Sequence, residues 1–146
     1  MDFELSEEQT ALREMAASFA TEELAPHAAE WDGTKHFPIE TLRKAGSLGL
    51  GAIYAREDVG GSGLGRLDAA LIFEALATGC PTVAAYISIH NMCTWMIDRF
   101  GSDEQRQRWI PGLAAMELLA SYCLTEPGAG SDAAALRSRA ERDGEH

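Results

Sequence analysis

Positively charged residues are scarce in this sequence. Twelve Lys and Arg residues stand against 23 Asp and Glu, which gives a formal net charge of −11 at pH 7. Nucleic acids and anionic membrane surfaces are bound through clusters of Lys and Arg, so neither is an expected partner. With 146 residues, 46% of them hydrophobic, the chain is long enough and apolar enough for one domain with its own core.

Cysteines and metal ligands are also few. Cys80, Cys93 and Cys123 are an odd number, have no C-x-x-C spacing and lie in apolar or β-prone runs, which predicts buried, reduced thiols. His27 and His36 have no Cys or carboxylate at ligand spacing, so no metal site is expected there and both side chains should lie at the surface.

No run of residues is apolar throughout the length of a membrane span. Residues 75–96 carry no charge and approach the ~20 residues that a spanning helix needs. Polar side chains dilute them, however, and Gly79 with Pro81 divides them, so a buried helix is expected. The acidic N-terminus, M-D-F-E-L-S-E-E, is unlike a signal or transit peptide. This predicts a cytoplasmic location, or the mitochondrial matrix if a transit peptide has been removed.

Capping signals and apolar periodicity predict six helices. Capping boxes formed by Ser6 with Gln9 and by Ser102 with Gln105 start the first and the last of them. The predicted helices run from Ser6 to Pro26, from Pro26 to Trp31, from Pro38 to Gly46, from Leu67 to Ala77, from Pro81 to Phe100 and from Ser102 to Ile110. Residues 81–100 have almost no polar face, so this helix is expected in the middle of a bundle.

Residues 121–132, S-Y-C-L-T-E-P-G-A-G-S-D, change abruptly from a β-prone run to a loop. The run Y-C-L-T favours a strand, and the proline biases the residue before it away from the helical region, so a strand should end here. Gly128 and Gly130 let a ligand approach the main chain. A short helical turn after Ser131 and Asp132 would direct its N-terminus toward the same loop. The pattern suits a pyrophosphate.

Two other interpretations of this loop stay open on spacing alone. It can be an ordinary strand-turn-helix corner, since Pro and Gly occur in most loops. Gly128, Gly130 and Ala133 also satisfy the dinucleotide fingerprint G-x-G-x-x-A, which would indicate a pyridine-nucleotide protein with parallel strands after His146. The six predicted helices that precede the loop do not provide the βαβ unit that this fingerprint requires.

The run Y-C-L-T-E-P-G-A-G-S-D resembles the flavin-binding signature of the acyl-CoA dehydrogenase family, and G-G-S-G at residues 60–63 resembles a Gly-Gly-x-Gly loop of the same family. The resemblance implies FAD as cofactor. The FAD-binding residues carried over from the family are Tyr122, Leu124, Thr125, Gly128, Gly130 and Ser131. In this interpretation the first three face the isoalloxazine, while Gly130 and Ser131 reach the phosphates and Ser131 also touches the CoA substrate.

Residues 86–98, Y-I-S-I-H-N-M-C-T-W-M-I-D, resemble the branched-chain member of the family that acts in valine breakdown. That resemblance implies that Ser88 and Met92 line the acyl pocket. The two residues are four apart and therefore lie on one face of a helix. Ordinary core packing of a buried helix is the alternative.

The expected fold is mainly α. The resemblance implies an N-terminal all-α domain at residues 1–116, and residues 117–146 would be the opening strands of a middle β domain. Asp143 and Gly144 are a strong hairpin signal, but no return strand follows, so the chain is expected to be truncated. A C-terminal helical domain, which carries the general-base glutamate in the family, would be absent, and the chain supplies no catalytic residue of its own.

The implied activity of the intact protein is FAD-dependent α,β-dehydrogenation of a short branched-chain acyl-CoA, similar to isobutyryl-CoA, with hydride transfer to flavin N5. The implied partners are an acyl-CoA substrate and an electron-transfer flavoprotein, and the full-length protein is expected to be a homotetramer. The 146-residue chain alone should be inactive. The alternative from a different class is a helical interaction module that derives from the family and has lost catalysis.

Overall fold

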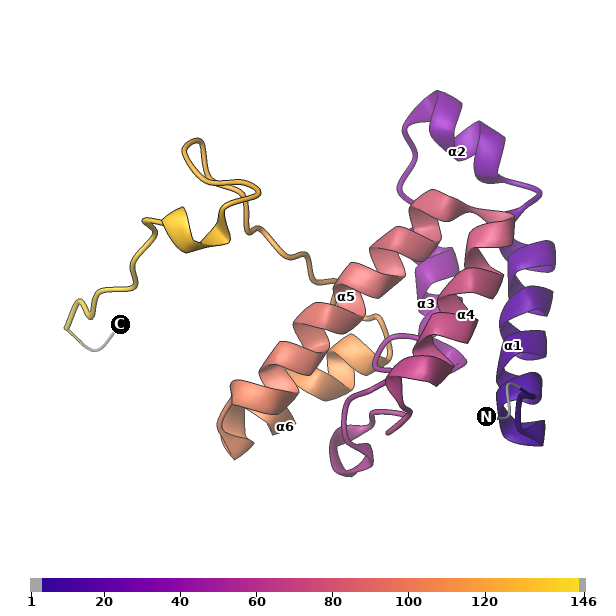
Figure 1. Cartoon of the computed structure of the whole chain (residues 1–146), viewed down its shortest axis with the longest axis horizontal. Helices are drawn as coiled ribbons and strands as arrows, with labels where there is room; N and C mark the ends of the chain where they lie inside the picture. The colour runs from indigo at the N-terminus through magenta and orange to yellow at the C-terminus, as the bar shows by residue number, and fades with distance from the viewer. Residues whose placement is uncertain (1–3, 145–146) are drawn as a thin grey trace.

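The computed structural model describes residues 4–144, in which six α-helices form a bundle (Figure 1). Their bounds are α1 Glu7–Phe19, α2 Ala28–Thr34, α3 Ile39–Ser47, α4 Arg66–Gly79, α5 Pro81–Phe100 and α6 Asp103–Ala114. A π-helical turn (η1, Ala20–Leu24) continues α1, and two 3-10 turns follow later in the chain (η2, Glu57–Val59; η3, Ala133–Ala135). The predicted six helices and the mainly helical fold are confirmed.

Both predicted capping boxes start their helices. The amide of Gln9 donates to Ser6 Oγ (3.1 Å), and the amide of Ser6 donates to Gln9 Oε1 (3.2 Å). Ser102 and Gln105 repeat this exchange at the start of α6, with distances of 3.2 and 2.8 Å. Each box satisfies two amides that have no partner within the helix, which fixes where the helix begins.

Several helix ends differ from the prediction, and two of the differences have a clear structural cause. Pro111 lies inside α6, and the helix continues to Ala114 although a proline removes one hydrogen bond of the helix. Near its end, Leu113 and Ile110 are buried, so packing outweighs the lost bond. Helix α2 passes its predicted end at Trp31 and stops after Thr34, where Lys35 takes a left-handed conformation with φ of 56°.

The bundle is built on α4, which packs against α1 on one side and α5 on the other, while α6 packs on α5. The main core contains apolar residues from α1, η1, α3, α4 and α5, and its larger side chains include Leu24, Leu42, Ile72, Leu76 and Ile87. A smaller cluster around Ile110 joins α6 to residues 52–59. No helix within residues 4–144 is both long enough and apolar enough to cross a membrane.

The prediction that α5 is apolar almost all round is wrong. His90, Asn91, Thr94 and Asp98 form a buried polar stripe along this helix, and every one of them is at most 5% exposed. The Asn91 side chain accepts a hydrogen bond from the amide of Ile53 (2.6 Å) and donates to the carbonyl of Leu50 (2.7 Å). Asn91 thus satisfies backbone groups of the irregular segment 48–65 that have no partner within that segment.

Asp98 is the charged end of this stripe. Its carboxylate accepts hydrogen bonds from Arg106 Nε (2.9 Å) and Arg56 Nε (3.1 Å), and Arg106 also pairs with Asp58 (2.7 Å). Burial alone would raise the pKa of Asp98, but the hydrogen bonds from Arg106 and Arg56 outweigh it and lower the pKa below its ordinary value of 3.8. The carboxylate thus joins α5, α6 and the segment before η2.

The lowered pKa of Asp98 predicts a pH-dependent stability. The pKa of Asp98 is lower in the folded state than in the unfolded state. The stabilisation by its carboxylate is therefore fully present above the unfolded-state pKa and is lost as the pH falls through the folded-state pKa. Urea unfolding of the unaltered chain should therefore show a lower midpoint at about pH 3 than at about pH 5, and Asp98→Asn should show a smaller drop. Asp103→Asn, at an exposed carboxylate beside Arg106, is the control and should keep the full drop. Equal drops of the urea midpoint in the unaltered chain and in Asp98→Asn would contradict a stabilising role of the Asp98 carboxylate.

Residues 117–144 leave the helices as an extended segment (Figure 1). No residue between 4 and 144 belongs to a strand, so the predicted strands are not formed in the described part of the chain. Neither residues 121–125 nor residues 137–140 belong to a strand. One isolated antiparallel bridge joins Glu126 to Ala129. A strand requires hydrogen bonds to a neighbouring strand, and the described part of the chain places none beside this segment. The predicted helical turn after Asp132 is present as η3, capped by Asp132 Oδ1, which accepts from the amide of Ala134 (3.2 Å).

Candidate flavin site

The loop predicted to bind FAD is a tight turn that stands away from the bundle. The amide of Glu126 donates to the carbonyl of Ala129 (2.8 Å), and the amide of Ala129 donates back to the carbonyl of Glu126 (3.1 Å). Ala129 itself is buried within this turn. The predicted FAD-binding residues are exposed, except Leu124, which is half-buried. The residues of the predicted site that are exposed are Tyr122, Thr125, Gly128, Gly130 and Ser131.

The glycines of the loop leave the main chain accessible. A Cβ added to Gly128 would meet no atom within 4 Å, and one added to Gly130 would meet only Thr125 Cγ2, at 3.8 Å. Neither glycine has a positive φ. The backbone conformation therefore does not require glycine at these two positions. What the missing side chains provide is free access to the backbone amides, as a phosphate group would need.

Glu126 holds the loop together and is not free for proton transfer. Its carboxylate accepts hydrogen bonds from the amides of Arg137 (2.8 Å) and Ser138 (2.9 Å). The side-chain hydrogen bond of Ser138, followed by these two amides, lowers the pKa of Glu126 below its ordinary value. Glu126 is thus an ionised residue that ties the turn to the residues after η3.

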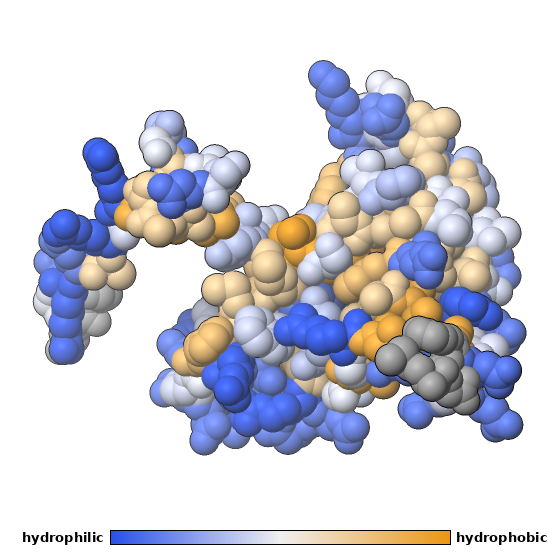
Figure 2. Space-filling view, in the orientation of Figure 1, coloured by the Kyte–Doolittle hydropathy of each residue, from blue (hydrophilic) through white to orange (hydrophobic). Residues whose placement is uncertain are grey.

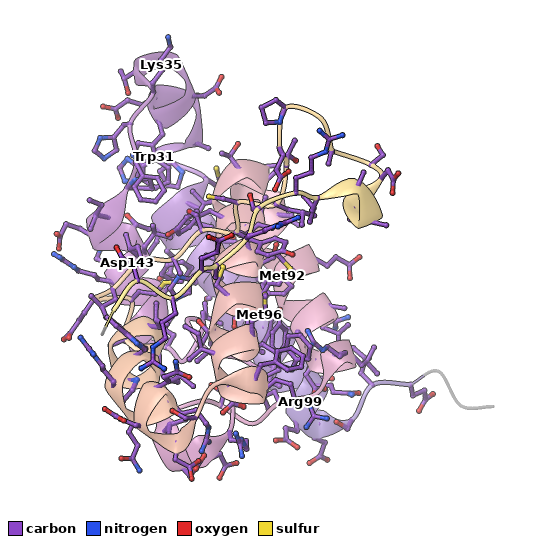
Figure 3. The ribbon with its side chains drawn as sticks, turned by 90° about the vertical axis from the view of Figure 1, so that its left-hand side faces the viewer. Trp31, Lys35, Met92, Met96, Arg99 and Asp143 are labelled. Atoms are coloured by element: carbon purple, nitrogen blue, oxygen red, sulfur yellow. The ribbon has the colours of Figure 1, made fainter. Side chains whose placement is uncertain are left out.

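Ser88 and Met92 lie on α5, outside the buried core. Both side chains are half-buried, and Ser88 Oγ donates to the carbonyl of Ala85 (2.8 Å). Figure 3, which is viewed from the side where residues 117–144 leave the bundle, shows Met92 and Met96 on successive turns of α5. Their face is thus separate from the buried polar stripe. The role of Ser88 and Met92 in an acyl pocket stays a prediction.

Apolar side chains are exposed around the origin of this segment. Figure 2 shows apolar and weakly polar residues along α5, where the segment leaves the bundle, and charged residues along the lower edge. Exposed large side chains near this origin include Ile89, Leu118 and Tyr122. Phe100 and Trp109 are also exposed, but they line a separate hollow between the end of α5 and α6. An apolar surface of this kind marks a place where another part of the protein or a partner packs.

The structure also contains a cavity that was not predicted from the sequence. A cavity of about 270 Å³ lies between α2, the start of α3 and the start of α5, and its aromatic lining includes Trp31, His36, Phe37 and Tyr86. The rings of Phe37 and Tyr86 pack edge to face with centroids 4.9 Å apart. The pair is distant in sequence, so helical periodicity gave no signal for this cavity.

The cysteines and histidines differ in part from expectation. Cys80 is buried as predicted, but Cys93 is half-buried and Cys123 is exposed, because residues 121–125 do not enter a sheet; all three thiols are free. His27 and His36 are exposed, as predicted. In the region from residue 4 to residue 144, no group of His, Cys, Asp and Glu side chains is arranged to hold a metal ion.

The chain is similar to known proteins in both sequence and fold. Residues 6–117 match the acyl-CoA dehydrogenase N-terminal domain family. The mitochondrial isobutyryl-CoA dehydrogenase of Bos taurus is 60% identical over 142 residues, which cover 97% of this chain and 34% of that protein. The enzyme of the same name from Dictyostelium discoideum is 53% identical over the same shares of both chains. This chain thus spans about a third of the length of these relatives.

Solved structures share the fold and substantial sequence identity. The glutaryl-CoA complex of glutaryl-coenzyme A dehydrogenase superposes with a TM-score of 0.88 and 33% identity, covering 93% of this chain and 35% of that one. The FAD complex of PigA superposes with a TM-score of 0.84 and 34% identity, covering 91% of this chain and 36% of that one. From the family match and the relatives alike, the chain belongs to the acyl-CoA dehydrogenase family.

Proposed function

We propose that the chain is the N-terminal part of an FAD-dependent dehydrogenase that acts on a short branched-chain acyl-CoA similar to isobutyryl-CoA. Residues 1–116 would be its helical domain and residues 117–146 the start of a β domain. The observation that carries the proposal is the open loop at residues 121–132 in a chain that is 60% identical to an isobutyryl-CoA dehydrogenase.

The loop offers groups of the kind that the cofactor would need. The uncovered amides around Gly128 and Gly130 and the exposed hydroxyl of Ser131 are donors of the kind that bind a pyrophosphate. In our proposal Tyr122 and Thr125, together with Leu124, face the isoalloxazine ring. Bound FAD would supply the acceptor for the hydride that leaves the β carbon of the substrate.

The second hydrogen leaves the α carbon as a proton, so a carboxylate base is needed. Glu126 does not suit this role, since its carboxylate is already hydrogen-bonded to Arg137 and Ser138. We assign the base to a glutamate outside these 146 residues, and we expect the chain alone to be inactive. Ser88 and Met92 would line the acyl pocket. An electron-transfer flavoprotein would reoxidise the flavin, and the assembled enzyme would be a homotetramer.

Gly130→Ala tests the proposed phosphate loop. In the protein expressed from its native gene, a methyl group at residue 130 should weaken FAD binding by about tenfold, or about 1.4 kcal/mol, because it occupies the approach to the main chain. The turn should keep its fold, since the new Cβ would lie 3.8 Å from Thr125 Cγ2. The measurement is FAD titration of the apoprotein by flavin fluorescence.

Ala134→Val is the matched control, because this residue lies in η3 outside the proposed set. It should bind FAD like the unaltered protein. Equal FAD affinity of Gly130→Ala and Ala134→Val would contradict the phosphate assignment. A native-gene protein that folds but binds no flavin would instead favour the inactive interaction module.

A further inference from the structure

His90 connects the helices to the segment that carries the flavin signature. Its ring lies on α5 and is fully buried. One ring nitrogen, Nε2, is 2.9 Å from the carbonyl oxygen of Leu113 near the end of α6. The other nitrogen, Nδ1, accepts a hydrogen bond from the amide of Ala120 (3.1 Å). One side chain thus binds the main chain on both sides of the point where the segment leaves the bundle.

Only one protonation state of His90 satisfies both contacts. The Leu113 carbonyl needs a donor at Nε2, and the Ala120 amide needs an acceptor at Nδ1, which is the neutral tautomer with its hydrogen on Nε2. Burial lowers the pKa of His90, and the hydrogen bond to Leu113 opposes this only in part. The neighbouring Tyr86 ring, 6.2 Å away, is itself kept neutral because burial raises its pKa.

The contact with Ala120 is the last anchor before the signature. The amide of Leu118 still donates to the carbonyl of Gly112 at 3.0 Å. Among residues 5–144, every hydrogen bond of residues 121–144 stays within that segment. Tyr122 follows Ala120 by two residues, so the place where the signature begins depends on the position of the Ala120 amide.

We propose that His90 is a positioning residue for the flavin site: its neutral imidazole fixes Ala120 and thereby the placement of Tyr122, Leu124 and Thr125. His90 acts through the main chain and need not touch flavin or substrate. The inference rests on the proposed function as far as flavin is concerned. The anchoring of Ala120 itself does not depend on it.

Three variants separate positioning from general stability. His90→Phe keeps a buried ring but removes both hydrogen bonds. His90→Gln keeps one donor and one acceptor and cannot titrate. Thr94→Val removes a buried hydroxyl one turn further along α5, where its partners are the carbonyls of His90 and Gly51, and leaves the segment untouched.

The first measurement uses the 146-residue chain and needs no flavin. The Ala120 amide should exchange its hydrogen at least about tenfold faster in His90→Phe than in the unaltered chain, and Thr94→Val should leave that ratio near one. The Ala120 amide signal of the unaltered chain should also move when His90 is protonated, at a pH below the ordinary histidine pKa of about 6.5 because burial lowers the pKa of His90, and His90→Gln should lack this step. Unchanged Ala120 exchange in folded His90→Phe would overturn the anchoring.

The second measurement uses the protein from its native gene. FAD affinity should fall about tenfold in His90→Phe, should recover to within about threefold in His90→Gln, and should be unchanged in Thr94→Val. Faster Ala120 exchange with unaltered FAD affinity would overturn the positioning role and leave the proposed function intact. Absence of FAD from the unaltered protein would overturn the proposed function, and with it the flavin part of this inference, while the exchange data still test the anchor.

Discussion

Replacement of Asn91 by Leu should lower the free energy of unfolding by about 3–5 kcal/mol. The Asn91 side chain is fully buried, accepts from the amide of Ile53, and donates to the carbonyls of Leu50 and Ile87. Leucine has the same branching at Cγ and the same number of side-chain heavy atoms, but it makes none of these hydrogen bonds. The amide of Ile53 and the carbonyl of Leu50 would then be buried without partners. Each such group costs about 1–3 kcal/mol.

Urea unfolding, followed by the helical circular dichroism signal, measures this loss. Ser88→Ala is the control on the same helix, because the Ser88 hydroxyl donates to the carbonyl of Ala85 in its own helix and lies toward the surface. Its effect should stay within about 0.5 kcal/mol. A loss below about 1 kcal/mol in Asn91→Leu would mean that segment 48–65 is held by its apolar contacts alone.

The second large effect is expected at the contact between η1 and α4. Gly79, the last residue of α4, allows the two backbones to approach so closely that an added Cβ would lie 2.4 Å from the carbonyl oxygen of Ala20. The added Cβ is bonded directly to the main chain, and the atoms that it meets belong to the backbone of Ala20, so neither side of the clash can rotate away. We therefore expect Gly79→Ala to destabilise the bundle by about 2 kcal/mol, even after the gain in helix propensity that alanine brings.

Gly33→Ala is a control of the opposite sign. Gly33 lies in the exposed helix α2, and a Cβ there would meet no atom within 4 Å. The same substitution should stabilise the protein by about 0.5–1 kcal/mol, since only helix propensity changes. Thermal unfolding of both variants gives the comparison. Equal shifts of Tm in the two variants would show that the close approach at Gly79 does not determine how η1 packs against α4.

Helix ends that depend on neighbouring residues could be predicted from the sequence. Helix α5 has the predicted bounds because Pro81 suits the first helical position and the helix stops at Gly101. The two capping boxes act within four residues and were likewise readable. The end of α6 was missed because the cost of Pro111 is outweighed by burial of residues far away in sequence, which no local pattern reports.

The buried polar stripe of α5 was missed for a related reason. His90, Asn91, Thr94 and Asp98 recur at helical spacing and could have been recognised as one face. Their partners lie in the irregular segment 48–65, in α6 and at Ala120, however, and a polar residue in an apolar helix does not reveal which backbone group it binds. His90, Asn91 and Thr94 also dilute the uncharged run 75–96, which otherwise approaches the length of a membrane span.

The signature loop was predictable because its turn is local, whereas the strand before it was not. Turn geometry at residues 126–129 and the cap at Asp132 follow from neighbouring residues. A strand depends on hydrogen bonds to another strand, and residues 4–144 provide no such partner beside Tyr122 to Thr125. The exposure of Cys123, predicted to be buried, has the same cause.

The visible absorption spectrum of the protein purified from its native gene, recorded without oxygen before and after addition of isobutyryl-CoA, tests the central claim most directly. The proposal predicts flavin bands in the purified protein and their bleaching by isobutyryl-CoA, because the substrate's hydride would reduce the bound cofactor. Butyryl-CoA, which is unbranched, should bleach the bands more slowly. A colourless folded protein, or flavin bands that no acyl-CoA bleaches, would contradict the assignment as a dehydrogenase.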